Sequence, residues 1–281
     1  MVSPDQFYAS QKRRAEATTI LARREWRKMV TLDDWGRIAS RVTMIVAASQ
    51  LGAARDGVAY VDSLDVEPDA AVRPQSLAGV ASDMRPLDTL LYSAVVHGRV
   101  GGWPDEAARL ASGLRWLNML VRTQVADAGR AATSLGITAR PDVGYYRMVS
   151  PPCCQLCAVQ AGKWFRWNAG FKRHPGCDCR HSPAGEGDPP DGYRSEIPPD
   201  QIHDLTQAQR DALAEGADLG RVVNAYRAGY DRGKLPDKMS DLTSVRKGAS
   251  RLTPEGIYKR ATSRAHAVEL LKQHGYLTDL S

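Results

Sequence analysis

Apolar residues recur at helical spacing in the first half of the 281-residue chain. The clearest case is the segment Gly101 to Gly136, where Pro104 suits a first helical turn and Gly136 suits a C-terminal cap. Its apolar residues recur every three, four or seven positions, as one buried helical face requires. They are Leu110, Leu114, Leu117, Val121 and Ala128. We therefore expect one long amphipathic helix here.

The region before this helix also predicts helices. Gln6 to about Val30 has helix-forming composition but few large apolar residues, so we expect it to project or to dock on a partner. The sequence TLDD favours a new helix with a Thr31 cap, because Asp34 occupies the third position of a capping box. Its apolar stripe is Trp35, Ile38, Val42 and Ile45. After a loop at 62–85, LDTLLYSAVVHG predicts a short helix ending at Gly98.

The pattern changes after Gly136. Tyr145 to Val149 and Lys163 to Trp167 have the β-branched and aromatic content of short strands. Five prolines between Pro183 and Pro199 indicate a linker. Four short helices are expected beyond it, over 207–215, 219–230, 253–261 and 263–274.

These patterns predict a mainly α fold of the α+β class. Its parts are a helical docking region over 1–137, a small zinc-stapled unit containing β-structure over 138–183, a Pro/Gly linker over 184–200, and a C-terminal set of short helices over 201–281.

All five cysteines fall within 27 positions. Cys154 and Cys157 form a C-x2-C pair, and His174 and Cys177 form a second tight pair around Pro-Gly, followed by Cys179. Two such pairs supply the tetrahedral nitrogen and sulfur ligands that zinc prefers. We therefore predict a structural zinc site.

The other interpretations of the cluster fit less well. An odd number of cysteines and a reducing compartment disfavour disulfides. A cysteine nucleophile needs one sulfur and leaves the pairing unexplained. Cys153 could replace Cys154, and either Cys177 or Cys179 could be the last ligand. His181 is expected to lie beside the site or in solvent.

A catalytic zinc site would leave one position open and place a carboxylate nearby. Here the candidate ligands fill the site, and the only local acid is Asp178. We therefore expect a closed zinc site, no enzymatic activity and no small-molecule substrate.

Charge suggests a second hypothesis. The net charge is +6, and residues 1–30 and 243–281 each hold seven Lys or Arg against three acids. Basic residues also alternate with aromatic ones in the cysteine region, as in modules that bind nucleic acid. They are Lys163, Arg166, Lys172, Arg173 and Arg180. The competing explanation is that two of the aromatic residues form the core of the unit.

No segment has the length and apolarity of a signal peptide or a membrane span, so we expect a protein of the cytosol or of a particle assembled there.

The combination at 147–183 resembles the phage Mu F-like family of head morphogenesis, or minor capsid, proteins. The shared features are an arginine in a strand at Arg147, the C-x2-C pair, Ala161-Gly162 before a strand, and the sequence HPGCDC. The family often has Arg where this chain has Asp178. The C-terminal RLTPEGIYKRATSRAHAVELLKQHGYL is similar to the tails of such proteins in phages of actinobacteria.

This resemblance implies a low-copy protein of the virion, in the capsid interior or at the portal vertex, that assembles in the host cytoplasm. The implied partners are portal, major capsid or scaffold protein, with phage DNA as a further one.

Overall fold

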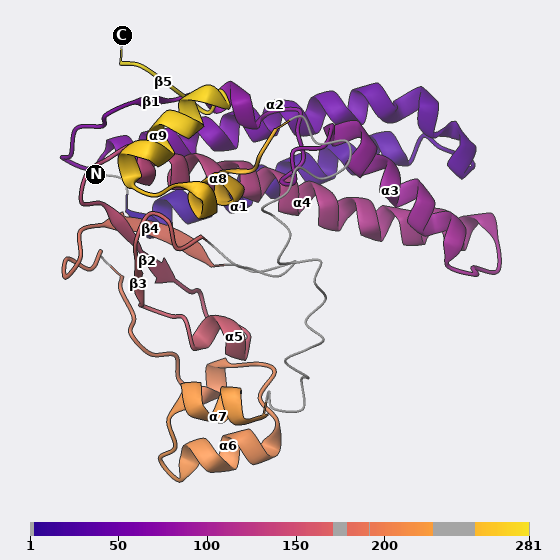
Figure 1. The fold of residues 1–281 in the computed structure, drawn as a ribbon. Helices are drawn as coiled ribbons and strands as arrows, with labels where there is room; N and C mark the ends of the chain where they lie inside the picture. The colour runs from indigo at the N-terminus through magenta and orange to yellow at the C-terminus, as the bar shows by residue number, and fades with distance from the viewer. Residues whose placement is uncertain (1–2, 171–178, 191, 227–250, 281) are drawn as a thin grey trace.

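The computed structural model describes residues 3–170, 179–190, 192–226 and 251–280. This part of the chain is mainly helical with two small sheets (Figure 1). The helices are α1 (Pro4–Trp26), α2 (Trp35–Asp62), α3 (Leu87–Val100), α4 (Glu106–Thr138), α5 (Gln155–Ala158), α6 (Gln207–Ala214), α7 (Leu219–Tyr226), α8 (Pro254–Arg260) and α9 (Arg264–Gln273). The short 3-10 helices are η1 (Leu32–Asp34), η2 (Pro74–Leu77) and η3 (Pro199–Gln201). The strands are β1 (Ala71–Val72), β2 (Gly144–Met148), β3 (Trp164–Phe165), β4 (Arg180–Ala184) and β5 (Leu277–Thr278). The predicted α+β class, mainly α, is confirmed.

The long helices α1, α2 and α4 pack side by side, and α3 covers α2 and α4 (Figure 1). The predicted face of α4 is buried at Leu117, Val121 and Ala128, and the stripe of α2 is buried at Trp35 and Ile38. These faces meet in one large apolar core, which is the main source of stability for such a bundle.

The first helix does not project as expected. α1 buries Phe7 and Trp26 at its two ends and small residues such as Ala15, Ala22 and Thr19 between them. Small side chains allow close helix approach, so α1 needs few large apolar residues to pack on α2 and α4. The expectation that α1 projects is wrong, because it considered large apolar residues and left the small ones out. Docking of α1 on a partner stays a prediction.

Glycine residues allow α2 and α4 to approach closely where they cross. A Cβ atom on Gly57 would lie 2.5 Å from the carbonyl oxygen of Gly129. Gly136, expected to end α4, lies inside the helix, and a Cβ there would lie 3.1 Å from Cβ of Val61. Ala139 caps α4 instead. Gly136 therefore permits helix packing and does not terminate the helix.

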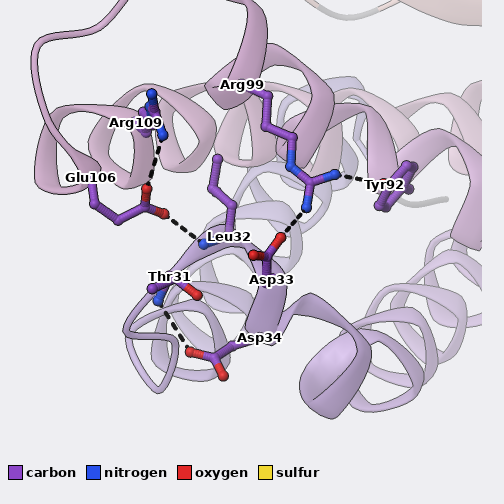
Figure 2. A network of polar contacts seen from close by, with 8 residues as sticks. All are labelled: Thr31, Leu32, Asp33, Asp34, Tyr92, Arg99, Glu106 and Arg109. Carbon is purple, nitrogen blue, oxygen red and sulfur yellow. Dashed lines mark hydrogen bonds and ion pairs between the residues drawn. The ribbon is translucent and has the colours of Figure 1, made fainter.

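The entry to α2 is held by polar contacts (Figure 2). Asp34 accepts hydrogen bonds from the backbone N–H groups of Val30 and Thr31, and this lowers its pKa. The backbone N–H of Leu32 donates to Glu106 at the start of α4 over 2.7 Å, and Asp33 pairs with Arg99 of α3. These contacts tie the turn to two other helices.

A three-stranded antiparallel sheet follows α4, in the order β3-β2-β4. Tyr145 pairs with Phe165 on one side and with Pro183 on the other. The two predicted strands are confirmed, with β3 shorter than expected. β4 was not predicted, because Pro183 suggested the start of a linker.

The C-terminal helices do not form one set. α8, α9 and β5 return to the bundle, where β5 pairs with β1 and Tyr276 is fully buried. In contrast, Leu213 of α6 and Leu219 of α7 pack against the apolar cluster of the cysteine region. The predicted linker also contributes a buried residue, Ile197, to that cluster. The expected linker is therefore packed, in part, on the unit before it.

The caps predicted for α8 and α9 are confirmed. Thr253 accepts a hydrogen bond from Gly256 N–H, and Pro254 occupies the first turn of α8. Gly275 has φ +73°, the left-handed conformation that closes a helix.

Candidate metal centre

The first cysteine pair lies on the one-turn helix α5. Cys154 is its N-cap residue and Cys157 occupies its third position, with the backbone N–H of Cys157 donating to the Cys154 carbonyl over 3.0 Å. The N-cap and third positions lie on one side of a helix, one turn apart. The C-x2-C spacing thus forms the tight turn that its sequence predicts.

The structure brings Cys179 to this turn. Cys179 immediately precedes β4, and its Sγ lies 3.0 Å from Sγ of Cys157, with both residues buried. The Arg130 guanidinium of α4 donates to the Cys179 carbonyl over 3.2 Å, which fixes the strand against the bundle. Two of the predicted ligands are therefore in contact, although 22 residues separate them in the chain.

The chemistry of this sulfur pair fits zinc. A disulfide bond would hold the sulfurs at about 2.05 Å. Two thiolates on one tetrahedral zinc would be about 3.8 Å apart, given Zn–S bonds of about 2.3 Å. The observed 3.0 Å between Cys157 and Cys179 lies between these values. Small side-chain movements would therefore bring the sulfurs to the separation on one zinc ion, or to that of a disulfide bond.

The described residues supply part of a ligand set. Among residues 3–170, 179–190, 192–226 and 251–280, no three His, Cys, Asp or Glu side chains are grouped to hold a metal ion. Two predicted ligands, His174 and Cys177, lie outside the described residues. A complete site would have to draw on them.

Cys153 faces a different environment from its neighbour. Its backbone pairs with the chain at Ile202: its N–H donates to the Gln201 carbonyl, and its carbonyl accepts from His203 N–H. Its buried side chain belongs to the same apolar cluster as Cys157 and Cys179. The backbone hydrogen bonds fix Cys153 beside Ile202.

His181 is a buried residue of β4. It meets the Tyr145 ring edge-on with ring centroids 4.5 Å apart. It also lines a small cavity with Asp127 and Glu255. Of the two expectations for His181, the position in solvent is wrong, because the strand turns the side chain toward α4. The position beside the metal site stays a prediction.

Arg180 is buried in a network of its own. Its guanidinium donates to Ser150 Oγ over 2.7 Å, pairs with Asp5 of α1 and lies 4.7 Å from the centre of the Tyr8 ring. Only 8% of its side chain is exposed. Its charge is therefore used inside the molecule, and its guanidinium is not exposed to a phosphate.

The remaining basic candidates divide between two situations. Lys163 and Arg166, which flank β3, are exposed. Lys172 and Arg173 lie outside the described residues.

The aromatic residues near them are packed. Phe165 stacks on Tyr145 at 5.3 Å, and Trp167 meets Tyr258 of α8 edge-on at 5.8 Å. Burial raises the pKa of the Tyr145 hydroxyl, which donates to the Gly170 carbonyl over 2.6 Å. The aromatic residues build the core of the unit, as the competing explanation held.

Sequence reasoning missed the link between the N-terminus and β4. Asp5 lies 175 residues before Arg180 in the chain. No spacing rule connects Arg180 with Asp5 or Tyr8. The only signal was the run of basic and aromatic residues around the cysteines, which was assigned to a surface.

Comparisons of the chain with family models, curated proteins and solved structures gave no match. No helix among the described residues has the length and apolarity needed to cross a membrane.

Proposed function

We propose that this chain is a structural protein of a phage head, a minor capsid protein whose cysteine unit is held together by zinc. The observation that carries the proposal is the contact between Cys157 and Cys179, which joins the C-x2-C turn to the strand after HPGCDC. In this proposal, the motif that resembles Mu F-like proteins acts as a metal staple.

The proposed ligands are Cys157 and Cys179, which are in contact, with two more drawn from Cys154, His174 and Cys177. Bound zinc would supply a cross-link between α5 and the start of β4. Such a link suits the cysteine unit (β2, α5, β3 and β4), because its own apolar cluster is small beside the core of the bundle. Arg130 and Arg180 position β4 from the other side.

In this proposal the bundle is the rigid body that docks on portal, major capsid or scaffold protein during assembly. The nucleic-acid-binding alternative has weaker support, because Arg180 is buried and Phe165 and Trp167 are packed.

The location of the protein in purified phage particles tests the proposal. Chemical cross-linking followed by mass spectrometry is expected to recover the chain in cross-links with portal or capsid protein. Absence of the chain from both mature particles and assembly intermediates would refute the assignment.

A further inference from the structure

The α1–α2 hairpin contains more basic than acidic residues. Every carboxylate between residues 4 and 62 is in an ion pair. The pairs are Asp5 with Arg180, Glu16 with Arg122, Glu25 with Lys28, Asp33 with Arg99, Asp34 with Arg37, Asp56 with Arg14 and Asp62 with Arg140. No acid of this segment is left to neutralise its other cations.

Seven cations of the same segment have no ion pair within the described part of the chain. They are Lys12, Arg13, Arg23, Arg24, Arg27, Arg41 and Arg55. All except Arg23 are exposed. The hairpin therefore presents uncompensated positive charge to solvent.

The two helices present this charge on a shared side. They run antiparallel, because Arg14 pairs with Asp56 and Thr18 bonds to Ser49. The exposed residues of each helix recur every three, four or seven positions, as one helical face requires. They are Arg13, Ala17, Leu21 and Arg24 on α1, and Arg37, Arg41, Met44, Ala48 and Arg55 on α2. We call this set, with Ile20, the hairpin face.

Large apolar side chains are exposed among these charged residues along the two helices. Ile20, Leu21 and Met44 are 48%, 43% and 58% exposed. They are flanked along the helices by Arg13 and Arg24 on α1 and by Arg41 and Arg55 on α2. An apolar centre with a charged rim is typical of protein interfaces.

We propose that the hairpin face binds an acidic amphipathic helix of a partner protein. A helix with leucine-like residues along one side would cover Ile20, Leu21 and Met44, and glutamate or aspartate on its flanks would pair with the free arginines. Nucleic acid would use the arginines only, because a phosphate backbone has no apolar surface to bury. The proposal stands independently of the metal site.

A direct binding assay on the full-length protein tests it. The probe is a synthetic amphipathic peptide of about 20 residues, about 30 Å long as a helix, with leucines on one face and glutamates beside them. A peptide of the same composition with the leucines scattered is the matched control, and a duplex of about 20 base pairs tests the nucleic-acid outcome. Fluorescence anisotropy reports the dissociation constants.

We expect saturable binding of the amphipathic peptide only. Arg24→Glu with Arg41→Glu should raise its dissociation constant at least about tenfold, and Leu21→Ser with Met44→Ser by a similar factor. Arg221→Glu with Lys259→Glu, at exposed positions on α7 and α8, is the charge-matched control and should leave binding unchanged.

Three outcomes would overturn the proposal: no binding of the peptide, equal binding of the scattered peptide, or preferred binding of the duplex through Arg24 and Arg41. Circular dichroism and zinc content of each variant separate these outcomes from loss of fold or of metal.

Discussion

Arg180 shows how a single residue can have a role opposite to the one its sequence context suggests. A cation beside cysteines and aromatic residues indicated phosphate binding, yet its guanidinium is bound by Ser150, Asp5 and the Tyr8 ring. A buried guanidinium needs such partners, because its desolvation costs several kcal/mol otherwise. Arg180 therefore fixes the N-terminus of α1 to the strand that follows Cys179.

Asp5→Asn tests this role. The change removes the charge that faces Arg180, and we expect the free energy of unfolding to fall by about 1–2 kcal/mol. Urea denaturation measures it. Asp188→Asn, at an exposed position, is the control and should change stability by less than about 0.5 kcal/mol. Equal stability of Asp5→Asn and the control would contradict the role.

Tyr258 predicts a dependence of stability on alkaline pH. Burial raises its pKa from 10.0 to about 12, and Thr138 donates a hydrogen bond to its hydroxyl oxygen. Since the folded state holds this proton more tightly, its stabilisation is complete below pH 10 and is lost as pH rises toward 12. The expected slope is at most roughly 1.4 kcal/mol per pH unit from this residue.

Urea denaturation between pH 9 and pH 11 measures that slope, a range set by the ordinary tyrosine pKa of about 10. Tyr258→Phe should flatten it, whereas Tyr92→Phe, at an exposed tyrosine, is the control. The slope will not vanish, because burial also raises the pKa of Tyr145 and Tyr276. A slope that is unchanged by Tyr258→Phe would contradict this account.

At the scale of elements, helices with a regular apolar stripe were predictable and their packing was not. The stripe of α4 fixed its existence and face, but Gly136 was assigned to its end because glycine commonly caps helices. The glycine is used for approach to Val61 of α2, a tertiary contact that local sequence does not reveal. The packing of α1 was not predictable for the same reason. Its small residues indicate a buried face only when the helices that they contact are known.

Gly57→Ala tests the crossing of α2 and α4. The new Cβ would meet the Gly129 carbonyl at 2.5 Å, and we expect a loss of about 1–3 kcal/mol in the free energy of unfolding. Gly36→Ala is the matched control, because a Cβ there meets nothing within 4 Å. Alanine should raise stability at position 36 by up to about 1 kcal/mol. Equal effects at the two glycines would show that the crossing tolerates a wider spacing.

At the scale of the whole molecule, the described part of the chain forms two apolar clusters, and the order of the helices in the sequence does not predict which cluster each helix joins. The C-terminal β5 pairs with β1 across the bundle, and Tyr276 donates to the Leu252 carbonyl over 2.7 Å inside that core. α6 and α7 join the cysteine unit instead. Composition marked the segments between them as linker and loop, but which core each helix joins depends on long-range contacts that no periodicity encodes.

Removal of metal should therefore destabilise the apolar cluster of the cysteine unit and leave the core of the bundle intact. If zinc cross-links α5 to β4, a chelator is expected to speed amide hydrogen exchange in β2 and β4 and to leave α2 and α4 protected. Hydrogen-exchange mass spectrometry with and without chelator measures both regions in one sample. Uniform loss of protection, or none, would contradict a local staple.

The most direct test of the proposed staple is the zinc content of the purified full-length protein, measured by elemental mass spectrometry. The account predicts about one zinc per chain, lost in Cys157→Ser and in Cys179→Ser and retained in Cys153→Ser, whose backbone pairs with the chain at Ile202. Protein that is folded without zinc, or Cys157→Ser and Cys179→Ser variants that retain it, would contradict the central claim.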